Sequence, residues 1–189
     1  MSTKVKGETT YHRRRQRLMA SLLPPGVTLD IGCKARSLKP LLPSHEYFGL
    51  DVSGGDIMAD AEDLPLREGA FDSVACGEVV EHLRNPQKCV DEIRRVLKDG
   101  GVAVVSTPNL GTLHAGDAYL RDPEHINCMD YARLRSMLAG YSTVRRHGFD
   151  IFLESPGHGL GDVLPYRFRR ALAQRFLSLD KILVVELKP

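Results

Sequence analysis

The 189-residue sequence has no long hydrophobic run and no marked excess of charge of either sign. No apolar stretch reaches the roughly 18 residues that a membrane helix requires, and the N-terminus MSTKVKGETT lacks the hydrophobic core of a secretory signal. Lysine and arginine number 26 against 24 aspartates and glutamates, so composition alone does not indicate binding to nucleic acid or phospholipid. We therefore expect a cytoplasmic protein without a membrane span.

Cysteines are few, and their spacing excludes the common zinc-binding patterns. The four cysteines form no CxxC pair and have no accompanying metal-ligand spacing, which favours reduced thiols in an intracellular protein. No metal site is predicted. No internal repeat or low-complexity tract is visible either, and the length is that of one compact domain covering residues 1–189.

Strand-like and helix-like patterns alternate along most of the chain. Apolar runs typical of buried strands occupy residues 27–32, 46–53, 54–60, 71–78 and 101–108, and helical patterns occupy residues 9–23, 37–42 and 85–97. Asn85 is the predicted N-cap of the third helix, and Gly100 its stop. Because parallel neighbours need crossover connections, this order predicts an α/β fold with a three-layer, doubly wound, mostly parallel sheet.

The last part of the chain carries a long loop and a different strand arrangement. Residues 109–127 follow a strand without a clear helix or strand pattern, which predicts an active-site loop or lid. Asp130 is expected to cap a helix that runs to Leu138. The two strands near Val144 and Val184 have little between them besides one basic helix, so the final strand is predicted to be antiparallel.

The basic helix at residues 166–177 and the N-terminal string YHRRRQR raise the question of RNA binding. Phe168, Leu172 and Phe176 recur at helical spacing, which instead indicates an amphipathic helix with a solvated arginine face. No aromatic and basic motif of an RNA-binding module is present. Binding to nucleic acid is therefore not predicted.

The residues that follow the first, second and fourth strands are the first candidates for a ligand site. In an open parallel sheet, ligands bind at the carboxyl ends of strands near the point where strand order reverses. Gly32 permits a close turn there, and Asp51 lies 19 positions later, near the spacing of an acid that binds ribose hydroxyls. The structural alternative is that Asp51 is a solvated acid in a turn beside Ser53.

Five segments together carry a resemblance. LDIGC at residue 29, GLDVS at 49, DAEDLPL at 60, FDSVACGEVVEHL at 71 and RVLKDGGVAVVSTPN at 95 resemble, in order, the motifs of class I S-adenosylmethionine-dependent methyltransferases. The resemblance implies S-adenosylmethionine as cofactor and methyl transfer to an oxygen or nitrogen of a small-molecule acceptor. It also divides the chain into an N-terminal helical segment (1–26), a cofactor-binding half (27–109) and an acceptor-side half (110–189).

The same resemblance implies roles for individual residues. Asp30 and Gly32 are expected to bind the methionine part of the cofactor, and Asp51 is expected to bind the ribose. Asp60 and Ala61 are expected to bind the adenine, and Gly77 and Glu78 are expected to lie near the sulfonium.

The chain departs from the family pattern in the first loop. Lys34 and Arg36 stand where the second and third glycines of the family belong, so side chains occupy a tight turn at a cost of roughly 1 kcal/mol. Two cations near a sulfonium would also oppose cofactor binding. This leaves open a second hypothesis, a binding protein that kept the methyltransferase fold and lost turnover. A nicotinamide dehydrogenase would need G-x-G-x-x-G, which GCKARS does not supply.

Two histidines are the candidates for catalysis. Methyl transfer needs a base only when the acceptor starts protonated. His82 follows Glu81 in a motif that is common in the family the chain resembles, and His125 lies in DPEHIN before a predicted capped helix. The structural alternatives are that His82 orients a helix start and that His125 packs a loop. No motif in the sequence specifies the acceptor or the oligomeric state.

Overall fold

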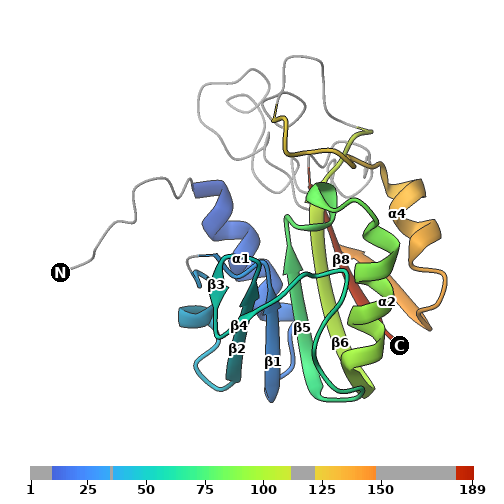
Figure 1. Ribbon diagram of the computed structural model, residues 1–189. Helices are drawn as coiled ribbons and strands as arrows, with labels where there is room; N and C mark the ends of the chain where they lie inside the picture. Colours follow the sequence, from blue (N-terminus) through green and yellow to red (C-terminus); the bar gives the residue numbers. More distant parts are fainter. Residues whose placement is uncertain (1–9, 35, 112–121, 148–181) are drawn as a thin grey trace, which may run out of the picture.

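A seven-stranded, mostly parallel sheet forms the centre of the molecule (Figure 1). The computed structural model describes residues 10–34, 36–111, 122–147 and 182–189. Strand order is β4-β2-β1-β5-β6-β8-β7, and the strand bounds are β1 Val27–Ile31, β2 Glu46–Asp51, β4 Ile57–Met58, β5 Phe71–Gly77, β6 Leu97–Pro108, β7 Thr143–His147 and β8 Ile182–Lys188. A further two-residue strand, β3, spans Gly54–Gly55.

The strand directions confirm the predicted fold class. β1 pairs in parallel with β2 and β5, β4 pairs in parallel with β2, and β6 pairs in parallel with β5. β8 is antiparallel to both β6 and β7. The antiparallel last strand is therefore confirmed, and β1, between β2 and β5, marks the point where the strand order reverses.

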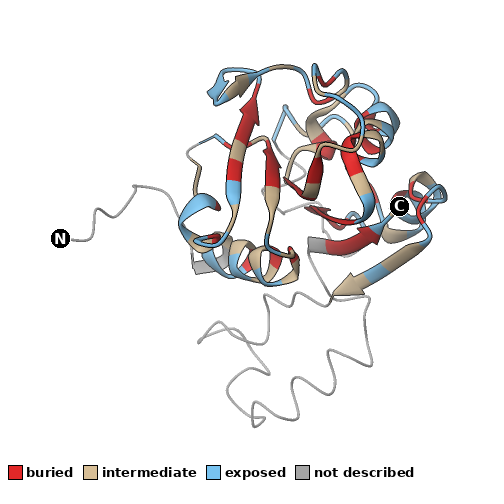
Figure 2. Ribbon diagram, turned by 90° about the horizontal axis from the view of Figure 1, so that it is seen from below, coloured by how far each residue is buried: buried red, intermediate tan, exposed pale blue. Residues whose placement is uncertain are grey.

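Helices cover both faces of this sheet. On one face, α1 (Thr10–Leu22) and the 3-10 turn η1 (Lys39–Leu41) contribute the apolar side chains of one core cluster, and on the other, α2 (Pro86–Val96) and α4 (Tyr131–Met137) contribute to a second. Figure 2 shows the buried residues concentrated in the strands between these helices. The three-layer arrangement follows, because each strand that lies between two helical layers is buried on both faces.

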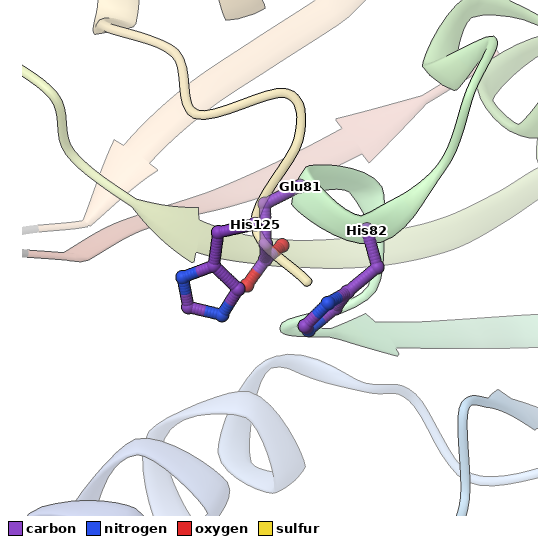
Figure 3. A group of neighbouring side chains, drawn as sticks. All are labelled: Glu81, His82 and His125. Carbon is purple, nitrogen blue, oxygen red and sulfur yellow. The ribbon is translucent and has the colours of Figure 1, made fainter. Parts of the chain in front are cut away.

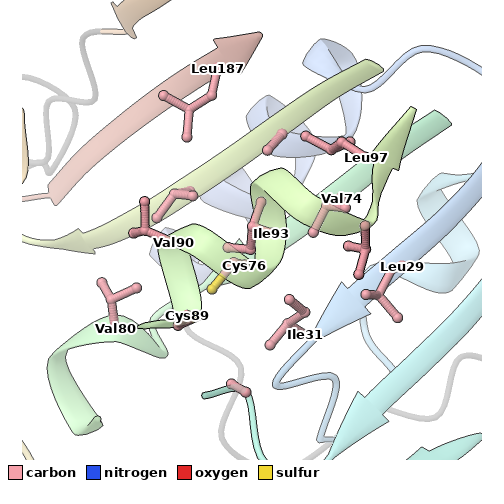
Figure 4. Packing of buried hydrophobic residues seen from close by; sticks show 14 of the residues in the cluster. Leu29, Ile31, Val74, Cys76, Val80, Cys89, Val90, Ile93, Leu97 and Leu187 are labelled. Carbon is pink, nitrogen blue, oxygen red and sulfur yellow. The ribbon is translucent and has the colours of Figure 1, made fainter. Parts of the chain in front are cut away.

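The larger core cluster joins α2 to the centre of the sheet. Val90 and Ile93 of the helix lie against strand residues that include Leu29, Ile31 and Val74 (Figure 4). Their spacing of three residues puts both side chains on one helical face, as the periodicity of this segment predicts. This packing fixes the strand ends around which the candidate site is built.

Both predicted helix starts agree with the structure, but only one of them has a side-chain cap hydrogen bond. The Asp130 side chain accepts a hydrogen bond from Arg133 N at 2.8 Å, so the predicted cap of α4 is confirmed. Asn85 occupies the predicted N-cap position of α2, before Pro86, but its side chain makes no cap hydrogen bond. Its backbone N–H donates to Glu62 Oε1 at 2.8 Å instead. The chain also enters β6 directly at Leu97, before the expected stop at Gly100.

Two expected elements lie wholly or partly outside the described residues. The basic helix at 166–177 is one of them, and residues 112–121 of the expected lid are the other. None of the helices that the structure describes is long and apolar enough to cross a membrane.

Candidate cofactor and acceptor site

A pocket of about 660 Å³ opens at the carboxyl ends of β1 and β2. Its position, next to the reversal of strand order, is where open parallel sheets bind ligands. Residues from five chain segments line it: Ile31, Gly32, Lys34, Leu50, Asp51, Val52, Ala59, Asp60, Ala61, Glu62, Glu78, Val79, His82, Leu83, Arg84, Glu124 and Ile126. Five of the seven predicted cofactor residues are among them, namely Gly32, Asp51, Asp60, Ala61 and Glu78.

Asp51 ends β2 and presents a carboxylate to this pocket. Its Oδ2 atom accepts from Lys34 N at 3.0 Å, and its Oδ1 atom accepts from the N–H and the hydroxyl of Ser53 at 3.1 and 3.2 Å. Burial raises the pKa of Asp51, but these hydrogen bonds outweigh it and leave the pKa below its ordinary value. Asp51 is therefore an ionised acceptor at neutral pH, and its Oδ2 atom retains a further lone pair.

The loop after β1 keeps a glycine-like turn despite its side chains. Lys34 and Arg36 have φ angles of 38° and 53°, in the left-handed region that favours glycine. Lys34 is exposed at the pocket, whereas the Arg36 guanidinium forms an ion pair with Asp56 at 2.8 Å. Of the two cations in this loop, Lys34 alone lines the pocket.

Gly32 is required by its surroundings as well as by its backbone. It has a φ angle of 73°, and a Cβ atom there would overlap the side chain of Val79. The N–H groups of Gly32 and Cys33 both donate to the Leu50 carbonyl, at 2.8 and 3.1 Å. These bonds tie the turn after β1 to the end of β2, so the two strand ends form one wall.

Two of the predicted cofactor residues do not line the pocket. The Asp30 carboxylate is buried and accepts a hydrogen bond from the Tyr47 hydroxyl at 2.5 Å. Burial raises the pKa of Asp30 to about 6, although the Tyr47 bond and the charge of Arg15 act in the opposite direction. At Gly77 an added Cβ would meet the Met19 side chain at 3.2 Å. Asp30 and Gly77 directly precede Ile31 and Glu78, which do line the pocket.

The residues that follow β4 also line the pocket. Asp60 is exposed, and its Oδ1 atom accepts from Glu62 N at 2.9 Å. Ala61 is buried beside it. Val52 is 70% exposed and Leu83 is partly buried, so this side of the pocket offers apolar surface near an acid.

The structure brings the two predicted catalytic histidines together. His82 lies in the 3-10 turn η2 (Val80–His82), and its ring centroid is 4.6 Å from that of His125 in an edge-on arrangement (Figure 3). His82 lines the pocket, as do the neighbours of His125, Glu124 and Ile126. Burial lowers the pKa of His82, and the charges of His125 and Lys34 act in the same direction. His82 is therefore a neutral imidazole at neutral pH.

Glu81 lies next to these histidines and is fully buried. The Thr107 hydroxyl donates to its Oε2 atom at 3.1 Å. Burial and the charge of Glu78 raise the pKa of Glu81 to about 8. Sequence reasoning missed this residue, although an acid that directly follows the apolar pair Val79 and Val80 is a signal of a buried charge.

Comparison with known proteins identifies the family. A family model described as a methyltransferase domain matches residues 29–105. A protein of Mycolicibacterium smegmatis named as a probable S-adenosylmethionine-dependent methyltransferase is 32% identical over 133 residues, which cover 67% of this chain and 50% of that protein. The chain belongs to the class I S-adenosylmethionine-dependent methyltransferases.

Solved methyltransferases share the fold of this one. A S-adenosylmethionine-dependent methyltransferase from Archaeoglobus fulgidus has a TM-score of 0.69 at 18% identity, with 94% of this chain and 92% of that chain covered. The N-methyltransferase NodS from Bradyrhizobium japonicum, solved in complex with S-adenosylhomocysteine, has a TM-score of 0.65 at 16% identity, with 96% and 89% covered. The chain spans about half the length of the curated relative from M. smegmatis.

One further residue beside the pocket was missed by sequence reasoning. Arg15 of α1 is buried and forms an ion pair with Glu78 Oε2 at 3.1 Å. Glu78 has a φ angle of 57°, and burial raises its pKa while Arg15 lowers it. Arg15 precedes the buried Met19 by one helical turn, so the helical spacing already placed it on the face that packs against the sheet.

Proposed function

We propose that this chain binds S-adenosylmethionine in the pocket and transfers the methyl group to an oxygen or nitrogen of a small-molecule acceptor. The observation that carries the proposal is Asp51, an ionised carboxylate fixed by hydrogen bonds at the end of β2 and facing the pocket. A carboxylate in this place can accept both hydroxyls of a ribose.

The residues present fit the cofactor in shape and in chemistry. The left-handed turn at Lys34 leaves the backbone close to the cavity, as a bound ligand requires. Val52 exposes 70% of its surface beside the pocket, which an adenine ring would cover. The retained turn supports cofactor binding over the alternative of a fold that has lost it.

Different residues of the pocket would bind different parts of the cofactor. Asp51 accepts hydrogen bonds from the ribose, the Asp60 carboxylate accepts from the adenine amino group, and Ala61 offers its backbone N–H to the ring. Gly32 and Glu78 enclose the methionine part, while Asp30 and Gly77 support the wall behind it. S-adenosylmethionine, when bound, supplies an electrophilic methyl group on its sulfonium.

His82 and His125 are the proposed catalytic residues on the acceptor side. His82 lines the pocket and has a lowered pKa, so it is unprotonated at neutral pH and able to take a proton from an acceptor. Binding both partners in one pocket contributes to the rate, because it removes the entropy cost of bringing them into line.

Isothermal titration calorimetry with S-adenosylhomocysteine tests the cofactor site directly. Asp51→Ala removes charge-assisted hydrogen bonds worth about 1.5–3 kcal/mol, so the dissociation constant should rise roughly tenfold to a hundredfold. Asp63→Ala is the matched control, because Asp63 is exposed and does not line the pocket. An unchanged dissociation constant for a folded Asp51→Ala variant would overturn the assignment. Formation of S-adenosylhomocysteine from S-adenosylmethionine in the presence of hydroxyl or amine compounds then tests methyl transfer.

A further inference from the structure

Glu81, His82 and His125 bring three metal-ligating side chains together beside the pocket. One carboxylate oxygen and one ring nitrogen from each histidine all lie within 4.8 Å of one another, and the three side chains point toward one another in Figure 3. Ligand atoms that share a metal ion at ~2.1 Å lie roughly 3–4 Å apart. Small side-chain rotations would therefore bring the three groups to coordination distance.

A second, independent observation points to a missing partner for Glu81. Its Oε1 atom is buried and has no hydrogen-bond partner among the residues that the structure describes, while Oε2 is already held by Thr107. A buried carboxylate oxygen without a partner is costly. A bound cation would supply the interaction that this oxygen lacks.

Hydrogen bonds with neighbouring groups fix the orientation of these side chains, as hydrogen bonds to metal-binding side chains commonly do. The Nδ1 atom of His82 lies 3.1 Å from the Glu124 carbonyl and donates to it, which leaves the lone pair on Nε2. The Thr107 hydroxyl fixes the Glu81 carboxylate in the same manner. The nearby Glu78 carboxylate is paired with Arg15 and is not needed as a ligand.

We propose that Glu81, His82 and His125 bind a divalent transition-metal ion on the acceptor side of the pocket. Two imidazoles and one carboxylate suit Zn²⁺, Fe²⁺, Co²⁺ or Mn²⁺, whereas Mg²⁺ and Ca²⁺ prefer oxygen ligands throughout. The cysteine spacing predicted no metal site, and these three residues have no metal-ligand spacing in the sequence.

Three protein ligands would leave a coordination position for an acceptor group, and His82 lines the pocket. This role rests on the proposed function: with the ion bound, His82 and His125 would act as its ligands in place of direct proton transfer, and the ion would supply a Lewis acid that lowers the pKa of an acceptor hydroxyl. The hydroxyl proton passes to solvent, the oxygen lone pair forms the new C–O bond, and the C–S bond of the cofactor breaks. Hydroxyl compounds are then the preferred acceptors.

Metal binding is measured on the full chain after chelator treatment, without any added polyhistidine tag. Titration with Zn²⁺, and with Co²⁺ followed by visible absorption, should show one tight site with a d–d spectrum typical of nitrogen and oxygen ligands. His125→Asn and Glu81→Gln should each weaken binding at least tenfold and abolish the Co²⁺ spectrum. Glu81→Gln retains the Thr107 contact, and circular dichroism verifies that both variants are folded.

The control is His147→Asn. His147 lies in β7, outside the cluster, and pairs with Glu186 of β8. This substitution should leave metal affinity unchanged. Equal Zn²⁺ affinity and equal Co²⁺ spectra for wild type and His125→Asn would overturn the proposal. S-adenosylhomocysteine titration of the metal-free protein keeps the two proposals distinguishable, because cofactor binding without any cluster-dependent metal binding overturns the metal site alone.

Discussion

At the scale of single residues, backbone and side chain can have separate roles at one position. The Lys34 N–H donates to Asp51, a contact that any residue other than proline can make. Its side chain lines the pocket and adds a positive charge there. Arg36, which replaces a glycine in the same loop, has its charge engaged by Asp56. The two departures from the family pattern therefore have different consequences.

Lys34→Gly is expected to tighten binding of S-adenosylmethionine relative to S-adenosylhomocysteine. The two ligands differ in the positive charge of the sulfonium, so the ratio of their dissociation constants reports repulsion by Lys34. At this exposed site the effect should be ~0.5 kcal/mol, about twofold. Calorimetry with both ligands measures it.

Arg36→Gly is the control for this charge effect and should leave the ratio unchanged, because the guanidinium is paired with Asp56. If Lys34→Gly instead weakens both ligands equally, the lysine holds a group that they share, such as the cofactor carboxylate.

At the scale of elements, the two helix starts named in the sequence show how capping depends on side-chain direction. Asp130 and Asn85 are both residue types that favour the N-cap position. The Asp130 side chain turns back to Arg133 N, whereas at Asn85 it is the backbone N–H that is engaged, by Glu62. Residue type predicted both starts, and the surrounding contacts selected the one at which the cap forms.

Asp130→Ala should lower the free energy of unfolding by ~1 kcal/mol, because the N–H of Arg133 loses its partner. Asn85→Ala, at an exposed position without a cap bond, should change it by less than about 0.5 kcal/mol. Urea denaturation of both variants against wild type provides the comparison. A larger loss for Asn85→Ala than for Asp130→Ala would contradict the assigned contacts.

At the scale of the whole molecule, Asp30 links folding stability to pH. Its pKa rises from 3.8 to about 6 on folding, mainly because of burial. The folded state therefore binds the proton more tightly than the unfolded state. This contribution to stability is fully present below pH 3.8 and is lost as the pH rises through about 6.

Asp30→Asn should remove this dependence. The asparagine oxygen can still accept from Tyr47, and no charge is buried at neutral pH. The free energy of unfolding of the variant relative to wild type should rise by about 2 kcal/mol between about pH 4.5 and about pH 7.5. Urea denaturation at the two pH values tests this, with the exposed Asp63→Asn as control. A constant difference across the range would show that Asp30 does not titrate as described.

The sequence by itself determined the fold and the ends of the strands. The spacing of apolar residues reflects which side chains become buried. Apolar runs alternating with helical patterns therefore predicted the parallel sheet and its antiparallel end. Gly32 and Asp51 could be predicted to lie at the pocket because a turn and an acid directly after a strand must lie at its carboxyl end.

Only the tertiary structure decided which side chains face the pocket and which meet one another. Asp30 turns to Tyr47 and not to the cavity, and Arg15 reaches Glu78 from another element. His125 approaches His82 because the segment after it is held to η2, with Asn127 N donating to the Glu81 carbonyl at 2.8 Å. Such contacts join residues far apart in the chain, and they depend on packing geometry that residue type and spacing do not encode.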